Sequence, residues 1–245
     1  MVTIYCKGRS FEGIEAIIFD KDGTLEDSQQ FLRELAYRRS RRIDAQVPGA
    51  GEPLLMAFGV SGDRLNPAGL MAVGSRGENE IAAAAYVAET GRSWFEAREL
   101  VKQAFLEADR QGGTAPPSPL FPGVLALLKR LAASGVKLGI LSADTPAAVA
   151  DFIQRHQLSP YLQLGLGVEI AGLSKPDPRL FAEACDRLGV LPERTLMVGD
   201  SQGDMEMAKA AGCAATVGIC WTGTQNRALA AADALIFELA DLKVS

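Results

Sequence analysis

The sequence predicts an α/β fold, a Rossmann-like doubly wound parallel sheet into which a block of helices is inserted. Short apolar runs alternate with helical patterns from residue 123 onward, and this alternation is typical of parallel βαβ units. One apolar run near residue 15 precedes a long stretch in which helical spacing predominates. That stretch ends in a segment rich in proline and glycine, where we expect a hinge.

The first strand is predicted at residues 15–19, a short apolar run with β-branched side chains. The run stops at Asp20-Lys21-Asp22-Gly23, a pattern typical of a buried strand that ends in a tight turn. Ligands of open parallel sheets gather where the strands end. We therefore expect chemistry in this turn, with Lys21 pointing away from it because side chains alternate along a strand.

Helical spacing follows the first strand. Apolar side chains recur between Phe31 and Ala36, residues 78–90 are rich in alanine, and Ser93 with Glu96 forms a capping box for a helix that reaches about residue 110. The composition of residues 112–119 then breaks the helix. We predict an all-helical unit at 28–116, inserted into an α/β unit made of residues 1–27 and 117–245.

The rest of the α/β unit is predicted as alternating helices and strands. The expected strands lie at 136–141, 195–198 and 214–219, and the expected helices end at 133, begin at Thr145, and lie at 180–188, 204–211 and 224–232.

Carboxylates follow two of the predicted strands. Asp20 and Asp22 follow the first, and such a pair can supply a nucleophile and a proton donor. Asp200 and Asp204 follow the strand at 195–198, and their oxygen atoms are ligands that Mg²⁺ prefers. Four carboxylates in one pocket repel one another, so the sequence predicts a Mg²⁺ ion there.

Two other segments could hold phosphate. Ser142 follows the strand at 136–141, and its hydroxyl, together with backbone amides around Ala143, can bind phosphate oxygens. Lys175 lies in a turn before a helix and offers a compact positive charge.

On these motifs the sequence resembles the haloacid dehalogenase-like hydrolase superfamily. The family's four motifs are similar here to Asp20-Lys21-Asp22-Gly23-Thr24-Leu25, Ser142, Lys175 and Gly199-Asp200-Ser201-Gln202-Gly203-Asp204, in the family's order. The inserted helical block is similar to the α-helical cap of phosphoglycolate phosphatases and β-phosphoglucomutases. One departure is Ala143, where many relatives have an Asn, and it leaves the subfamily open.

The resemblance implies a Mg²⁺-dependent phosphatase that hydrolyses a small phosphomonoester, of phosphoglycolate or sugar phosphate type, through an aspartyl-phosphate. The implied roles are nucleophile and metal ligand for Asp20, general acid and base with a metal-bound backbone carbonyl for Asp22, metal ligand for Asp200, water-mediated or supporting ligand for Asp204, and phosphate binding for Ser142, Ala143 and Lys175. A phosphosugar mutase uses the same motifs, and a noncatalytic phosphate- or metal-binding module is a further alternative.

Two arginines in the helical block are candidates for substrate specificity. Arg76 precedes a predicted helix in a glycine-containing loop, and Arg39 falls on the apolar stripe of the first helix. Both could contact substrate, although a solvated surface residue (Arg76) and a paired interface residue (Arg39) are the simpler interpretations.

Composition and charge limit the classes of binding partner and the cellular location that we expect for this protein. The formal net charge of −5 opposes a broad nucleic-acid surface, and no apolar run approaches the length of a membrane helix. Four cysteines without a CxxC pair indicate reduced thiols, so we expect a cytoplasmic protein with a small phosphorylated metabolite as its partner. Nothing in the sequence indicates the oligomeric state.

Overall fold

The computed structural model describes residues 1–110, 117–168, 173–221 and 229–245. The chain divides into two compact units, one made of Met1–Asp27 with Pro119–Ser245 and the other of Ser28–Ser118. We refer to them as the α/β unit and the helical unit. Most of the hinge predicted at 112–119 lies outside the described residues.

The α/β unit is built on a parallel sheet of six strands in the order β10-β9-β8-β3-β6-β7, which confirms the predicted fold class. Its first strand in the chain, β3, lies between β8 and β6, with Phe19 level with Val198 and Ile140. Residues that follow these three strands therefore meet at one edge of the sheet. The strands are β3 (Ala16–Phe19), β6 (Lys137–Leu141), β7 (Leu164–Leu166), β8 (Thr195–Gly199), β9 (Ala215–Ile219) and β10 (Ala234–Ile236).

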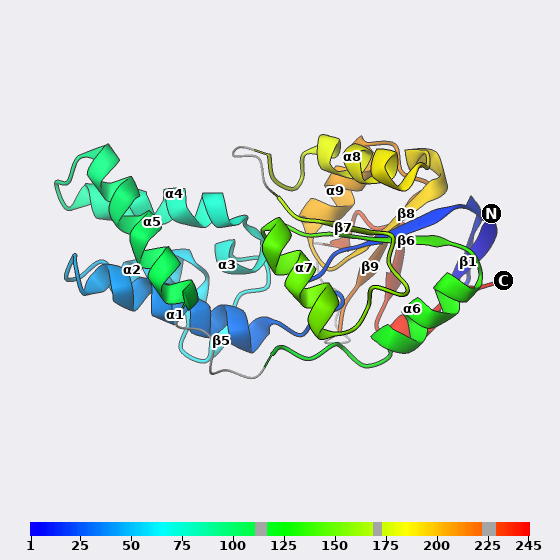
Figure 1. Ribbon diagram of the computed structural model, residues 1–245, viewed down its shortest axis with the longest axis horizontal. Coiled ribbons are helices and arrows are strands. Elements are labelled where there is room, and N and C mark those ends of the chain that lie inside the picture. Colours follow the sequence, from blue (N-terminus) through cyan, green and yellow to red (C-terminus); the bar gives the residue numbers. More distant parts are fainter. Residues whose placement is uncertain (111–116, 169–172, 222–228) are drawn as a thin grey trace. The chain divides into compact units, whose positions relative to one another are not determined.

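Helices cover both faces of this sheet (Figure 1). Helices α6 (Val124–Ala133) and α7 (Pro146–Arg155) pack on one face, and α8 (Pro178–Leu188) and α9 (Gln202–Ala210) on the other. Alternate residues of β3 serve the two cores, because Ile17 and Phe19 pack with α6 and α7 while Ala16 and Ile18 pack with α8 and α9. This double burial explains why β3 is apolar throughout.

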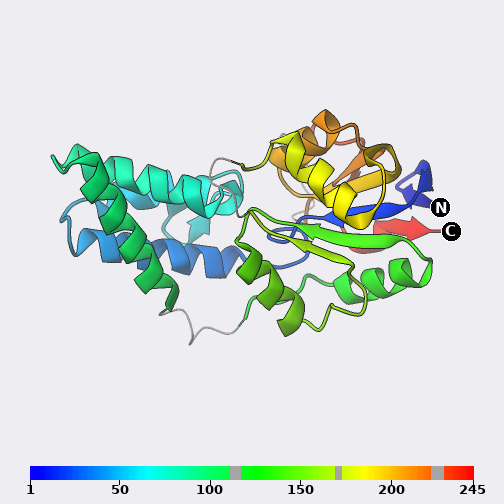
Figure 2. The same ribbon diagram turned by 45° about the horizontal axis from the view of Figure 1, so that its top comes forward.

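A second sheet, which the sequence did not predict, joins the two ends of the chain. Strands β1 (Val2–Cys6), β2 (Arg9–Ile14) and β11 (Leu242–Val244) are antiparallel in the order β11-β1-β2. Both termini lie at this end of the unit (Figure 2). Short 3-10 turns lie at Pro192–Arg194 and Leu239–Asp241.

The helical unit departs from the all-helical prediction, which was wrong in one respect. A small antiparallel hairpin of β4 (Val60–Ser61) and β5 (Arg64–Leu65) turns through Gly62, whose φ of +56° favours glycine. Strands of two residues carry too little periodicity to be predicted. The helices are α1 (Gln29–Asp44), α2 (Gly51–Ala57), α3 (Leu70–Val73), α4 (Arg76–Glu89) and α5 (Trp94–Arg110).

Several predicted helix ends are confirmed by their caps. Ser93 and Glu96 exchange capping contacts at the start of α5, and Thr145 accepts a backbone hydrogen bond before Pro146 in α7. The helix predicted at 224–232 lies largely outside the described residues. Among the residues that are described, no helix is both long enough and apolar enough to cross a membrane.

Candidate active site

The turn after β3 places Asp20 and Asp22 at the carboxyl edge of the sheet. The backbone N–H of Asp20 donates to the carbonyl of Val198 at 2.9 Å, so the strand pairing continues to the first carboxylate. The chain then folds back tightly, because the N–H of Glu26 donates to the carbonyl of Lys21 and the N–H of Gly23 to the carbonyl of Glu26.

Three carboxylates converge at this edge. One oxygen from each of Asp20, Asp200 and Asp204 lies within 4.8 Å of the others. Asp200 follows β8, and Asp204 is buried in the first turn of α9, where Ser201 donates to its Oδ2 at 2.6 Å. The capping box thus fixes one oxygen of Asp204, and the other, Oδ1, is bonded to Lys175.

Lys175 provides the positive charge of this cluster. Its Nζ lies 2.5 Å from Oδ1 of Asp20 and 2.7 Å from Oδ1 of Asp204, and its side chain is 6% exposed. Burial alone would lower the pKa of Lys175, but the two carboxylates raise it above the ordinary value. The ammonium group therefore stays charged at neutral pH.

The same crowding acts on the carboxylates. Burial raises the pKa of Asp20 to about 7, with repulsion from Asp204 and Asp22 acting in the same direction and Lys175 opposing it. Burial, then repulsion from Asp20 and Asp204, raises the pKa of Asp200 well above its ordinary value. A set of crowded carboxylate oxygens fits a hard divalent cation, which would relieve this repulsion.

This crowding leads to a prediction for stability without metal. Because the pKa of Asp20 is raised from 3.8 to about 7 on folding, the folded state binds more protons than the unfolded state between these values. The free energy of unfolding of the wild type should therefore fall, relative to that of Asp20→Asn, by about 1 kcal/mol per pH unit from pH 5 to 7. Urea unfolding in EDTA at pH 5, 6, 7 and 8 measures it, and a difference that does not change with pH would contradict it.

The loop after β6 holds the predicted phosphate-binding residues. Ser142 is 1% exposed, and its Oγ accepts a hydrogen bond from the backbone N–H of Asp144 at 3.1 Å. Ala143 follows it directly, at the edge that also carries Asp20, because β6 lies next to β3. The sequence-predicted residues of the α/β unit therefore all occupy one edge of the sheet or, for Lys175, contact it.

Lys21 departs from its prediction. Its Nζ lies 2.6 Å from Oδ2 of Asp22, so the expectation that Lys21 points away from the site was wrong. Lys21 and Lys175 have different partners, because Lys175 contacts Asp20 and Asp204.

Sequence reasoning missed two residues that support the turn. The hydroxyl of Thr24 donates to Oδ1 of Asp200 at 3.4 Å. The indole Nε1 of Trp221 donates to the carbonyl of Gly23 at 3.0 Å, and its ring stacks on Phe121 at 4.2 Å. Thr24 belongs to the first motif and could have been found there, whereas nothing near Trp221 in the sequence points to Gly23.

Gly23 is required by both its backbone angle and its surroundings. Its φ is +78°, and a Cβ there would lie 2.1 Å from Oδ2 of Asp200. We expect Gly23→Ala to weaken Mg²⁺ binding at least about 10-fold by displacing Asp200, and to cost about 1–2 kcal/mol of stability through the left-handed backbone. Titration calorimetry with Mg²⁺ and urea unfolding measure the two effects.

Gly135 supplies the matched control. Its φ is +81°, but nothing lies within 4 Å of the Cβ that alanine would add. Gly135→Ala should therefore lose similar stability and keep its Mg²⁺ affinity. Equal Mg²⁺ affinities in the two variants would show that Gly23 is needed for its backbone angle alone.

The two candidate arginines lie in the helical unit and share one partner. Arg39 is 6% exposed, stacks over Phe105 at 4.3 Å, and pairs with Asp109 at 3.2 Å. Arg76 pairs with Glu80 at 2.8 Å and also with Asp109. It is the first residue of α4 rather than part of a preceding loop, because Ser75 caps that helix.

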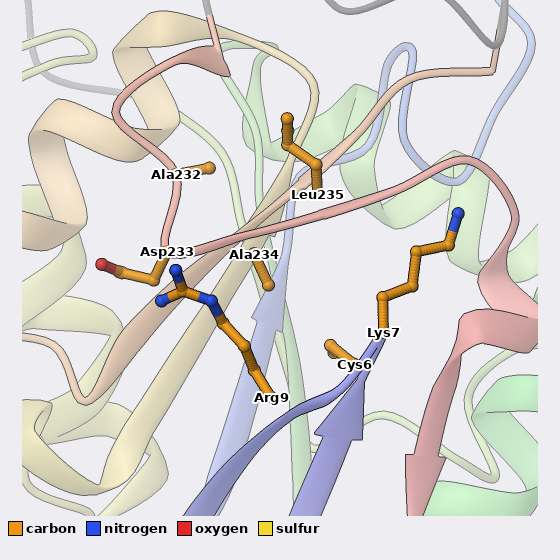
Figure 3. A pocket seen from close by; sticks show the side chains of 7 residues that line it. All are labelled: Cys6, Lys7, Arg9, Ala232, Asp233, Ala234 and Leu235. Carbon is orange, nitrogen blue, oxygen red and sulfur yellow. The ribbon is translucent and has the colours of Figure 1, made fainter.

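A hollow of about 230 Å³ elsewhere in the α/β unit is lined by the end of β1, the turn into β2, and the start of β10 with the residues before it, including Lys7, Arg9 and Asp233 (Figure 3). It lies by the amino end of β10, whereas the carboxylate cluster lies at the carboxyl end of β3. None of the sequence-predicted site residues lines it.

Comparisons with known proteins agree with this geometry. Residues 14–212 match the family model of haloacid dehalogenase-like hydrolases. A phosphoglycolate phosphatase of Yersinia pestis is 30% identical over 240 residues, which cover 95% of this chain and 93% of that protein.

Solved structures share the fold. A predicted phosphoglycolate phosphatase from Haemophilus somnus 129pt superposes with a TM-score of 0.68 at 24% identity, covering 94% of this chain and 96% of its own. A β-phosphoglucomutase from Clostridium difficile superposes with a TM-score of 0.61 at 18% identity, covering 91% and 90%.

Proposed function

The chain belongs to the haloacid dehalogenase-like hydrolase family, and on this premise we propose that it is a Mg²⁺-dependent phosphatase of small phosphomonoesters that works through an aspartyl-phosphate. The observation that carries the proposal is the buried cluster in which Lys175 bridges Asp20 and Asp204 next to Asp200. It combines a carboxylate nucleophile, a fixed positive charge and oxygen ligands for a cation.

In the first step, a carboxylate oxygen of Asp20 attacks phosphorus, and the bond from phosphorus to the ester oxygen breaks. Asp22 gives its proton to the departing oxygen, so the alcohol leaves neutral. Lys175, the hydroxyl of Ser142 and the amides around Ala143 hold the phosphoryl oxygens while negative charge moves across them.

In the second step, water attacks the phosphorus atom of the aspartyl-phosphate. Asp22, now without its proton, accepts a proton from this water. The bond between phosphorus and Asp20 breaks, inorganic phosphate leaves, and both carboxyl groups return to their starting states.

The cation would be held by Asp20, Asp200 and the backbone carbonyl of Asp22, with Asp204 supporting it through water. The three side chains fit because their oxygens lie close together and repel one another, with Asp20 and Asp204 buried and Asp200 half-buried. When bound, Mg²⁺ supplies positive charge that offsets the carboxylates and the phosphoryl group.

The substrate we propose first is 2-phosphoglycolate, since a relative of 30% identity is a phosphoglycolate phosphatase. Arg76 is the better candidate for its carboxylate, because the Arg76 side chain is 27% exposed and that of Arg39 only 7%.

Phosphate release from a panel of phosphomonoesters tests the proposal. The panel should contain 2-phosphoglycolate, several sugar phosphates and p-nitrophenyl phosphate, each with Mg²⁺ and with EDTA. We expect release with Mg²⁺ and none with EDTA. Release that is unchanged in EDTA would contradict the requirement for Mg²⁺. Conversion of a sugar phosphate to its isomer without net phosphate release would contradict the proposed phosphatase function.

A further inference from the structure

Lys21 is buried at the centre of a second charge cluster. Its ammonium group contacts three carboxylates, those of Asp22 at 2.6 Å, Asp144 at 3.0 Å and Glu26 at 3.1 Å. An ammonium group has three donors, so each can be directed at one carboxylate. The Lys21 side chain is 5% exposed, and its Nζ lies 5.7 Å from the centre of the Phe152 ring on α7.

Glu26 restrains Lys21 from the other side of the turn. The Glu26 side chain is 4% exposed and faces α7, where its Oε1 lies 3.4 Å from Arg155 and 3.7 Å from Nε2 of His156. Arg155 is itself held by Asp151 at 2.7 Å. The backbone adds a further restraint, since the N–H of Glu26 donates to the carbonyl of Lys21 at 2.9 Å.

Stability alone is a weak explanation for this arrangement. Burying a lysine and a glutamate costs desolvation energy, and an apolar pair of similar volume at these two positions would fill the same space without that cost. The charged pair instead gives Asp22 a fixed partner, because the carboxylate closest to the Lys21 ammonium group is that of Asp22. The Asp22 side chain is 17% exposed and would otherwise be free to change rotamer at the surface of the turn.

We propose that Lys21 is a positioning residue for Asp22 and that Glu26 holds Lys21 in place. With the ammonium on Oδ2 of Asp22, the proton of the acid form is carried on Oδ1, and the carboxyl group has one orientation toward the departing oxygen. The inference rests on the proposed phosphatase, in which Asp22 carries the proton.

Two esters that differ in their need for a proton test it. The nitrophenolate of p-nitrophenyl phosphate leaves without protonation, whereas the alkoxide of an alkyl phosphate such as 2-phosphoglycolate needs a proton. We expect Lys21→Met to lower kcat/KM about 10²-fold or more for the alkyl ester, in line with loss of general acid catalysis. The loss for the aryl ester should stay below about 10-fold.

The double variant Lys21→Met with Glu26→Met separates positioning from folding. Lys21→Met alone leaves Glu26 buried without its ammonium partner and could unfold the protein, whereas the double variant removes both charges. We expect the double variant to fold with near wild-type thermal stability. Its loss of kcat/KM should still be larger for the alkyl ester than for the aryl ester. If the double variant recovered wild-type kcat/KM for both esters, the proposal would be overturned, because Lys21 would then serve only to neutralise Glu26.

Lys209→Met is the matched control. Lys209 pairs with Asp233 at 3.1 Å and is 40% exposed, so this variant should keep the wild-type ratio of the two esters. Equal losses of kcat/KM for both esters in Lys21→Met would overturn the positioning role of Lys21 without contradicting the proposed phosphatase function. A wild-type protein that releases phosphate from neither ester would overturn both proposals.

Discussion

Asp20→Asn is expected to reduce phosphate release by roughly 10⁴- to 10⁶-fold, on the order of the losses measured when a member of a nucleophilic catalytic set is removed. The amide oxygen of asparagine is a poor nucleophile, so no acyl phosphate can form. The fold should persist, since Asn is nearly isosteric with Asp and the backbone N–H at position 20 continues to bond Val198. Single-turnover assays with a labelled phosphomonoester, with the acyl phosphate trapped by hydroxylamine, measure both the rate and the intermediate.

Asp186→Asn is the control for this variant. Asp186 lies on the exposed surface of α8 in the same unit, so its loss should change activity less than about 2-fold. If Asp20→Asn kept more than a tenth of the wild-type rate, Asp20 would not be the nucleophile and the aspartyl-phosphate mechanism would fail.

The central part of the fold could be predicted because its signals are local. The strand β3 is apolar on both faces and stops at a charged turn, and the caps at Ser93 and Thr145 are written within four residues of each helix start. The sheet of β1, β2 and β11 could not be predicted in this way. Its pairing joins Ile4 to Val244, and no local pattern carries information about a partner at the other end of the chain.

The same distinction applies to the site. The carboxylates and Lys175 follow from motifs that lie at the end of a strand, at the start of a helix or, for Lys175, in the turn just before a helix. The contacts of Lys21 with Asp144 and of Trp221 with Gly23 depend on tertiary packing, since the partners are distant in sequence. Alternation along β3 predicted the wrong direction for Lys21, because the strand ends at Phe19 and the tight turn redirects the side chains that follow.

Two buried lysines divide the acidic groups at this edge of the sheet. Lys175 contacts Asp20, the proposed nucleophile, and Asp204, which supports the proposed cation site. Lys21 contacts Asp22, the proposed proton donor, together with Glu26 and Asp144. Because each lysine serves different carboxylates, their removal should produce different defects.

Lys175→Met is expected to lower kcat/KM by roughly 10²- to 10³-fold for alkyl and aryl esters alike, because in the proposed mechanism it removes a charge that stabilises the phosphoryl group with either ester. It should also weaken inhibition by inorganic phosphate. Mg²⁺ binding should not weaken, since loss of the lysine makes the site of Asp20 and Asp204 more negative. Steady-state kinetics with both esters and calorimetric Mg²⁺ titration measure these effects.

The sign of the change in metal affinity is the decisive part of this prediction. A variant that merely disrupts the site would lose both Mg²⁺ and phosphate affinity, as we expect for Gly23→Ala, whose added Cβ displaces Asp200. Lys175→Met should separate the two, with phosphate affinity lost and Mg²⁺ affinity kept or increased. If both affinities fall together, Lys175 holds the carboxylates in place rather than the phosphoryl group, and the role of phosphate binding must move to Ser142 and the amides beside it.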